Sequence, residues 1–252
     1  MITMEHNSLV FRFPEVHEHA VLRIDFQRTL RIPDDNREYP LPPGLGRFPL
    51  QHVDDFSDKI PSSWIEHGGV LLPMYQAEAL WISFSSPNDY MFAVKVAAGK
   101  INAVTGENWS NKLSSTPQDY VVVPEQPWLD GFCIGKGLIR QFVAMPLGQD
   151  YTTEEQMTGK AAHGGIQLIV YPIKADIYDA SKRRPVLYQN CESSVVCNSM
   201  GLAPGGLMKQ EVYKDPYGYE AWEHSTNSRC FVHIVNSAQY FNLTGHPPPG
   251  MP

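Results

Sequence analysis

The sequence predicts a mainly β fold, a β-sandwich or jelly-roll-like body with a few short helical insertions. Prolines and glycines, 21 and 19 of 252 residues, interrupt the chain at short intervals, which favours strands over long helices. The segments between them are rich in Val, Ile, Leu, Thr and aromatic residues, and Ala20–Phe26 alternates apolar with polar side chains, as a strand with one buried face does. Long helices do not alternate with these segments, which argues against a doubly wound sheet and leaves an α+β fold as the alternative.

The strands follow from this pattern in chain order. Leu9–Phe13 and Ala20–Leu30 open the fold, and Met91–Val104 is predicted to be a hairpin that turns at Ala98-Gly99-Lys100. The other predicted strands share the same β-branched and aromatic composition: Gly68–Pro73, Ala79–Phe84, Tyr120–Val123, Leu138–Met145, Ile166–Ile173, Val186–Gln189, Leu207–Tyr213 and Cys230–Asn236.

Few segments carry helix signals. His52–Glu66 is predicted to hold a short helix with Pro61 in its first turn, and Met74–Glu78 a helical turn. Thr152–Gln156 begins with a threonine that is followed three residues later by an acid, which is typical of a helix start, and Gly159 is expected to end that helix.

We expect one β-rich domain over residues 1–252, with a proline-rich arm at 31–50 and a proline-rich surface tail at 245–252. The arm has five prolines and two glycines but also apolar residues such as Phe48, which a disordered linker lacks. The tail contains three consecutive prolines, which lack the amide donors that helices and inner strands require.

Charge and cysteine content exclude several classes of protein. The chain has 20 Lys and Arg against 27 Asp and Glu, and it lacks the concentrated basic surface that nucleic acid requires. Four cysteines are too few for a disulfide scaffold, so we expect reduced thiols. The sequence shows neither a signal peptide nor an apolar run that could span a membrane, so we expect a soluble, cytoplasmic protein.

We expect no cofactor. Gly131–Gly137 resembles a phosphate-binding loop, but the spacing of its glycines is one residue short, and Gly137 stands where a magnesium-binding hydroxyl is required. A hairpin turn that leads into Leu138–Met145 explains this segment better.

His17 and His19 are the weak metal candidates. The sequence His17-Glu18-His19 would place both imidazoles on one face of a strand, as in metal-binding jelly rolls. A carboxylate at the usual short spacing is missing, so a solvated polar edge is the favoured interpretation and no metal site is predicted.

His163, Glu78 and Asp130 are the weak catalytic candidates. His163 belongs to His163-Gly164-Gly165, which repeats the earlier His67-Gly68-Gly69, and a glycine pair allows a close approach of substrate. Two related halves are one explanation of this repeat, and coincidence or similar turn chemistry is the favoured one because the matching stretch is short. Glu78 and Asp130 each lie near a tryptophan, and paired carboxylates perform glycoside hydrolysis only at a defined separation.

Aromatic side chains are the candidates for ligand binding. Tyr217, Tyr219 and Trp222 stand among carboxylates, where flat rings could stack on a sugar or an apolar protein surface. Packing of Tyr219 and Trp222 in the core is the alternative. Trp128 follows two prolines that stiffen its loop.

Three runs resemble those of an uncharacterised family of bacterial and fungal proteins: Leu41–Leu50, Pro124–Phe132 and Ile139–Gly148. The resemblance implies no activity, fold or ligand. It implies only a standalone cytoplasmic protein.

From these patterns we expect a non-enzymatic binding or self-assembly module. It would engage a protein partner, or copies of itself in a homo-oligomer, through sheet edges and aromatic loops. A hydrolase with carboxylate or histidine chemistry in a cleft between the sheets is the first alternative. A carbohydrate-binding module that uses Trp128 or Trp222 is the second.

Overall fold

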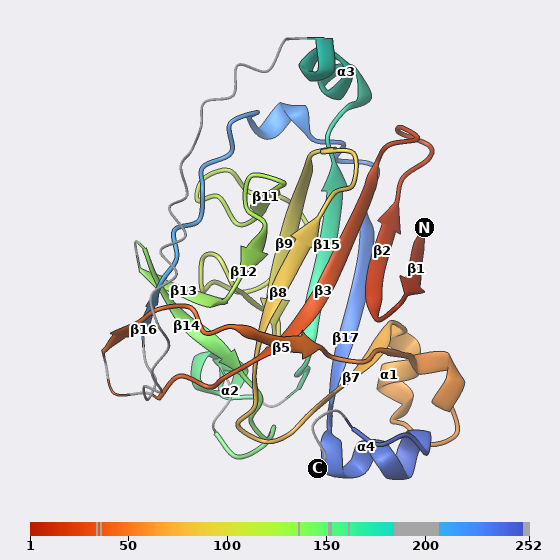
Figure 1. Ribbon diagram of the computed structural model, residues 1–252, viewed down its shortest axis with the longest axis vertical. Coiled ribbons are helices and arrows are strands. Elements are labelled where there is room, and N and C mark those ends of the chain that lie inside the picture. The colour runs from red at the N-terminus through yellow and green to blue at the C-terminus, as the bar shows by residue number, and fades with distance from the viewer. Residues whose placement is uncertain are drawn as a thin grey trace.

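The computed structural model describes residues 1–33, 35, 37–135, 137–150, 153–160, 162–183 and 207–248, and two β-sheets dominate it (Figure 1). The ten described strands of the first sheet follow the order β1 (Ile2–Glu5), β2 (Ser8–Arg12), β3 (Val21–Thr29), β8 (Ala79–Ser85), β14 (Leu138–Val143), β16 (Leu207–Lys209) and β4 (Glu38–Tyr39), with β5 (Gly44–Arg47), β12 (Trp128–Leu129) and β13 (Gly131–Gly135) beside β3, β8 and β14. The seven of the second follow the order β10 (Ile101–Asn102), β9 (Phe92–Ala98), β15 (Ile166–Pro172), β17 (Ser228–Asn236), β7 (Val70–Met74) and β6 (Gln51–His52), with β11 (Val121–Val123) beside β9.

The hydrophobic core lies between the sheets, and it explains the alternation in the sequence. In β3, Leu22, Ile24 and Phe26 are buried in this core, while the residues between them lie on the opposite face. The main cluster of buried side chains extends along the chain from Leu9 to Val232. The predicted mainly β, sandwich-like fold is confirmed.

The second sheet is covered on both of its faces, so its central strands lack alternation. All seven residues of β15 are buried. On the face turned away from the core, the loop over residues 103–119 covers one half, where the Tyr171 hydroxyl donates to the Asn111 carbonyl. Val235 and Tyr240 belong to a small apolar cluster over the other half. A strand buried on both faces reads as a continuous apolar run.

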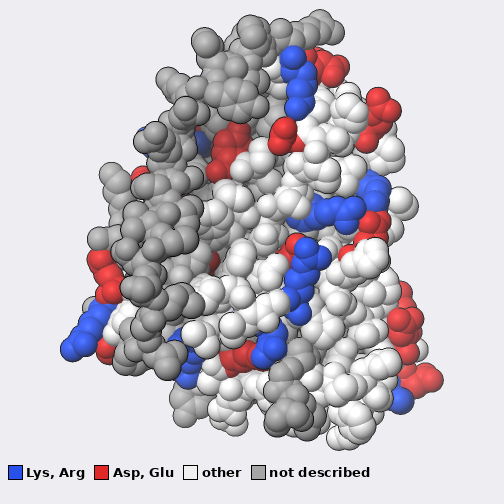
Figure 2. Space-filling model, in the orientation of Figure 1, with Lys and Arg blue, Asp and Glu red and all other residues white. Residues whose placement is uncertain are grey.

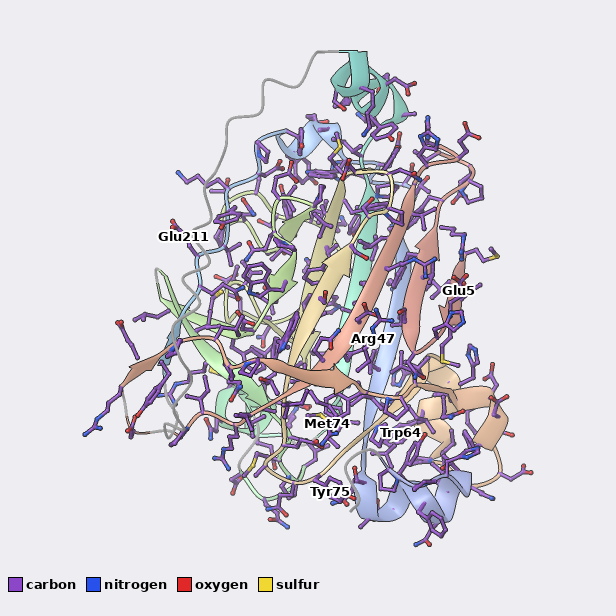
Figure 3. The ribbon with its side chains drawn as sticks, viewed as in Figure 1. Glu5, Arg47, Trp64, Met74, Tyr75 and Glu211 are labelled. Carbon is purple, nitrogen blue, oxygen red and sulfur yellow. The ribbon has the colours of Figure 1, made fainter. Side chains whose placement is uncertain are left out.

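The outer face of the first sheet is polar and is turned toward the viewer in Figure 1. Basic and acidic side chains are interspersed over this face (Figure 2). Figure 3 shows Glu5 at the edge formed by β1 and Arg47 nearer the centre of the face. Glu5 accepts from Arg12 at 2.6 Å, and the Arg47 guanidinium lies 3.6 Å from Asp25.

The helices lie at the ends of the sandwich. The described helical segments are η1 (Val53–Phe56), α1 (Ser62–His67), α2 (Thr153–Thr158), α3 (Ala175–Arg183), η2 (Tyr219–Ala221) and α4 (Ser237–Thr244). Helices α1 and α4 lie together at one end and α3 lies at the other (Figure 1).

Two predicted helices are confirmed and one is wrong. Helix α1 begins directly after Pro61, and α2 ends before Gly159. The predicted helical turn at Met74–Glu78 is instead a turn between β7 and β8, where the Glu78 side chain accepts from the Tyr75 amide at 2.9 Å. Helix α4 was not predicted, although the side chain of Asn236 caps it by accepting from the Ala238 amide.

Most predicted strands are present within one or two residues. The strands β1, β4, β5, β6, β12 and β13 were not predicted. The segment Gly131–Gly137 was expected to be a hairpin turn, but β13 occupies Gly131–Gly135 and forms the first arm of the hairpin whose second arm is β14. The strand expected at Leu207–Tyr213 ends at Lys209. The one expected at Val186–Gln189 lies outside the described residues.

The two proline-rich segments differ in exposure along their length. In the arm at 31–50, β5 is exposed throughout, whereas Phe48 and Leu50 are buried. In the tail at 245–252, residues 245–247 are exposed and Pro248 is buried. Residues 249–252 lie outside the described part of the chain.

The repeated His-Gly-Gly sequence has a geometric cause. It precedes β7 and β15, which flank β17 and both begin opposite Val232. A Cβ added at Gly69 would lie 2.1 Å from the carbonyl oxygen of Phe231, and one at Gly165 would lie 2.6 Å from that of Val232. Both glycines have positive φ angles. Each repeat therefore allows a strand to approach the backbone of β17 closely, which favours similar turn chemistry as its explanation.

None of the helices in the described part of the chain combines the length and the apolar character that a membrane crossing requires.

Candidate functional site

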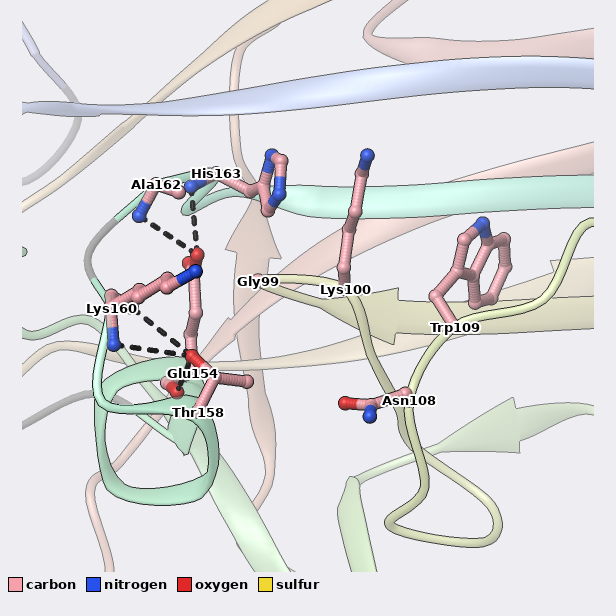
Figure 4. Close-up of a pocket in the computed structure, with 9 residues that line it drawn as sticks. All are labelled: Gly99, Lys100, Asn108, Trp109, Glu154, Thr158, Lys160, Ala162 and His163. Atoms are coloured by element: carbon pink, nitrogen blue, oxygen red, sulfur yellow. Dashed lines mark hydrogen bonds between the residues drawn. The ribbon is translucent and has the colours of Figure 1, made fainter.

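A pocket of about 260 Å³ lies where the β9–β10 turn meets α2 and the loop that follows it (Figure 4). The turn contributes Gly99 and Lys100, and the loop after β10 contributes Asn108 and Trp109. The rest of the lining comes from α2 and the residues before β15: Glu154, Thr158, Lys160, Ala162 and His163. One predicted site residue, His163, thus lines this pocket.

The buried carboxylate of Glu154 holds one wall of the pocket in place. One of its oxygens accepts from the amides of Ala162 and His163 at 2.9 and 2.8 Å, and the other accepts from the Gly164 amide at 2.7 Å. These backbone donors occupy both oxygens, so this carboxylate is committed to shaping the loop. A side chain with both oxygens bonded in this way is a poor general base.

Gln167 connects the two walls. Its side-chain oxygen accepts from the Lys100 amide at 2.7 Å, and its side-chain nitrogen donates to the Gly164 carbonyl at 2.9 Å. Gly99 lies so close to Glu154 that an added Cβ would be 2.6 Å from the Glu154 Cβ. The pocket is therefore pre-formed by hydrogen bonds between segments that are distant in the sequence.

The groups that remain open to a ligand are mainly cationic or neutral donors. The side chains of His163, Lys100 and Trp109 follow one another along the pocket in the view of Figure 4. Within the described part of the chain, the amines of Lys100 and Lys160 form neither a hydrogen bond nor an ion pair. Burial and the nearby Lys100 lower the pKa of His163.

Glu78, a predicted catalytic residue, lies outside this pocket. Its carboxylate bridges β3 and the β7–β8 turn, because one oxygen accepts from Arg28 and the other from the Tyr75 amide, both at 2.9 Å. An ion pair and a backbone bond account for both oxygens. The structure does not bring Glu78 together with His163.

Asp130 lies at the junction of β12 and β13 and also outside the pocket. It is only 3% exposed, and burial raises the pKa of its carboxyl from 3.8 to about 7, with a hydrogen bond from Trp128 acting in the opposite direction. One oxygen accepts from the indole nitrogen of Trp128 at 2.9 Å, and the other has no hydrogen-bond partner among the described residues.

We expect Asp130 to reduce the stability of the protein as the pH rises from about 4 to above 7. A carboxyl whose pKa is higher in the folded state than in the unfolded state stabilises the fold below its ordinary pKa of 3.8, and that stabilisation is lost as the pH rises through about 7. The loss is about 2–4 kcal/mol. The unfolding free energies of the protein and of Asp130→Asn, measured by urea denaturation across this range, should differ by an amount that depends on pH. A constant difference would contradict the prediction.

The aromatic candidates occupy different environments. Trp128 is 39% exposed, whereas Trp222 is fully buried and donates to Asp215 at 2.8 Å, so its ring is closed to a ligand and packs in the core. Tyr217 donates to Glu125. The ring of Tyr219 lies 4.3 Å from that of His224. The structure does not bring Trp128 into the pocket, and none of the other rings lines it either.

His17 and His19 lie in the turn between β2 and β3, so the expected strand at His17-Glu18-His19 is wrong. Their rings are 5.0 Å apart. Each already has a partner, because His17 lies 3.4 Å from Asp179 and His19 lies 3.2 Å from the Tyr178 hydroxyl. Among the described residues, no group of three or more histidine, cysteine or acidic side chains is arranged to hold a metal ion.

Cys133 and Cys230 are free thiols. Burial raises the pKa of Cys133 to about 11 and that of Cys230 to about 12, which is the reverse of what a nucleophilic cysteine requires. Cys191 and Cys197 lie outside the described residues.

Sequence reasoning missed the other residues of the pocket. Glu154 was seen only as part of a helix start, and Lys100 only as a turn residue. The one signal was the second His-Gly-Gly sequence, which marks the loop that closes the pocket. Nothing in the sequence links this loop to Trp109.

Fold and site together define a two-sheet β protein with a preformed, donor-rich pocket at one end. Comparisons with protein-family models, with curated proteins and with solved structures found no match. The resemblance of the three sequence runs to an uncharacterised family stays a prediction.

Proposed function

We propose that this protein is a non-enzymatic binding module that holds a small organic anion in the pocket beside α2. The proposal rests on which charged groups of the pocket already have hydrogen-bond partners. The pocket's only carboxylate among the described lining residues, that of Glu154, accepts three backbone hydrogen bonds, while the amines of Lys100 and Lys160 have no partner.

The chemistry of the lining supports a carboxylate or phosphate group as the bound anion. Two ammonium groups, the His163 ring and the Asn108 amide can donate hydrogen bonds to such an anion. The chain carries a net charge of −7, so this pocket differs in sign from the protein as a whole. A local cationic site retains its attraction for an anion because charges at a distance are screened by salt.

Trp109 supports an anion with a flat or apolar body. Its ring lines the pocket, and its indole nitrogen donates to Asn111 at 3.1 Å, which fixes the ring. The amine of Lys95 lies 5.1 Å from the ring centre. A fixed, partly buried ring offers apolar contact area at little cost in side-chain entropy.

The hydrolase alternative has less support. His163 is the one predicted catalytic residue in the pocket, and the nearest carboxylate, Glu154, cannot orient it while both oxygens hold backbone amides. Catalysis by a histidine base requires such a partner or an activated nucleophile within hydrogen-bond reach.

Benzoate and its neutral analogue benzamide test the proposal. We expect benzoate to raise the melting temperature in thermal unfolding and benzamide to have no effect. The double variant Lys100→Met and Lys160→Met should lose the benzoate effect, whereas Lys182→Met, which changes a lysine on α3, should keep it. Equal stabilisation by benzamide, or an unchanged benzoate effect in the double variant, would rule out the cationic site.

Assembly through sheet edges stays a second proposal. Among the described strands, β1 pairs only with β2, so its other edge presents backbone groups that could pair with another chain. Analytical ultracentrifugation at rising protein concentration should then show dimers. A monomer at every concentration would remove self-assembly.

A further inference from the structure

His163 lines the anion pocket with a ring whose nitrogens have no hydrogen-bond partner among the described residues. Its backbone is held in place, because its amide donates to the Glu154 carboxylate at 2.8 Å. The buried ring of His233 differs, since one of its nitrogens lies 2.9 Å from the Gly68 carbonyl. The side chain of His163 therefore begins at a fixed point of the backbone and leaves both ring nitrogens open to a ligand.

Cationic groups reach this ring from three elements. Lys100 lies in the β9–β10 turn and Lys160 in the loop after α2, and both line the pocket. His67, the last residue of α1, acts on His163 electrostatically from outside the pocket lining. The one acidic group that acts on the ring is Glu154. Within the described part of the chain, these four side chains are the charged and titratable groups that face His163.

This environment keeps a proton off the ring while the pocket is free. Burial, followed by the charge of Lys100, lowers the pKa of His163 below its ordinary value of 6.5, whereas Glu154 raises it and His67 adds a smaller lowering effect. The imidazole is therefore mainly neutral at neutral pH. A bound anion would place a negative charge beside the ring and an acceptor opposite its N–H groups, and both favour the protonated form.

We propose that anion binding is coupled to protonation of His163, so that the pocket binds its ligand more tightly in mildly acidic solution and releases it as the pH rises. This inference rests on the anion pocket proposed above and adds its regulation. Lys100 and Lys160 supply the attraction that does not depend on the histidine. The imidazole adds a further positive charge and a second N–H donor when it takes up a proton.

The affinity should fall as the pH rises, because the bound anion raises the pKa of the imidazole. A group whose pKa is higher in the complex than in the free protein contributes affinity that is complete below the free-protein pKa. That contribution is lost as the pH rises through the pKa of the complex. Since the free-protein value lies below 6.5, the change should fall between about pH 5 and about pH 8.

Isothermal titration calorimetry of the full chain with benzoate, at about pH 5.5 and about pH 8, tests the coupling. Bis-Tris, imidazole and Tris are suitable buffers, because their charged forms are cations that do not compete with benzoate. Benzoate itself stays ionised above about pH 5. We expect an affinity about three- to tenfold higher at the lower pH. Near neutrality, the heat of binding should depend on the buffer, because a proton is taken up.

His163→Gln should lose this difference in affinity between the two pH values, because glutamine keeps a hydrogen-bond donor but takes up no proton. The comparison is made between two pH values of one variant, so any contact that the imidazole itself makes with the anion at high pH does not enter it. His246→Gln is the matched control. It changes an exposed histidine that follows α4 and is not among the groups that act on His163, so it should keep the full pH dependence.

Nuclear magnetic resonance of the histidine ring protons provides a second measurement on the unmodified protein. His163 should titrate at a lower pH in the free protein than in the protein saturated with benzoate. The coupling is overturned if benzoate binds equally well at both pH values, if His163→Gln keeps the pH dependence, or if benzoate leaves the titration of His163 unchanged. A complete lack of benzoate binding at both pH values would instead contradict the anion pocket itself, and the coupling with it.

Discussion

Replacement of Gly69 by alanine is expected to lower the free energy of unfolding by about 3 kcal/mol or more. The new Cβ would lie 2.1 Å from the carbonyl oxygen of Phe231. No rotamer change can relieve this clash, because the backbone of residue 69 fixes the position of the Cβ and the oxygen belongs to the backbone of β17. The φ angle of +96° adds strain for any residue other than glycine. The clash would separate β7 from β17, the strand that lies between β7 and β15 in the second sheet.

Gly46→Ala is the matched control. Its φ angle is +107°, but an added Cβ meets nothing within 4 Å, so only the conformational strain of about 1 kcal/mol remains. Urea denaturation of both variants gives the comparison, provided that the dependence on urea is the same. Equal losses in the two variants would show that close approach to β17 is not what Gly69 provides.

Replacement of Asp119 by alanine is expected to cost about 3–5 kcal/mol. Lys95 is 0% exposed, and its amine donates to Asp119 at 2.6 Å and to the carbonyls of Ser110 and Lys112. Removal of the carboxylate would leave a buried ammonium without its counter-charge. The loop that these bonds hold also carries Trp109, so we expect the anion pocket to lose its ring wall.

Asp89→Ala provides the contrast, because Asp89 lies 3.6 Å from Lys182 in an exposed pair, and such pairs contribute about 0–1 kcal/mol. Thermal and urea unfolding measure both variants. Lys95→Met combined with Asp119→Leu should recover part of the stability, because replacing both members of a buried pair with apolar residues is less costly than removing one. A loss for Asp119→Ala no greater than for Asp89→Ala would contradict the prediction.

The period of the apolar residues made much of the fold predictable. Ala20–Phe26 alternates because β3 has one face in the core and one in solvent, and the predicted strand matches the observed one closely. Ile166–Ile173 was predictable from its apolar run alone. Helix α3 was not predicted, because a short polar helix at the end of a sandwich carries neither a cap signal nor a wide apolar face.

The candidate sites were predictable only in part. His163 was singled out and lines the pocket, and Trp128 and Asp130 were singled out separately and are hydrogen-bonded to each other. Glu154 and Gln167, which shape the pocket, were missed because their partners are backbone groups in other segments.

The amino-acid sequence by itself determined that this chain forms stacked β-sheets, because side-chain alternation and the spacing of glycines and prolines are local properties that act on neighbouring residues. Only the tertiary structure decided which polar groups are occupied and which are open to a ligand. That distinction depends on hydrogen bonds between segments far apart in the chain, such as those of Gln167 with Lys100 and of Glu78 with Arg28, and the local sequence pattern does not show which distant segments meet.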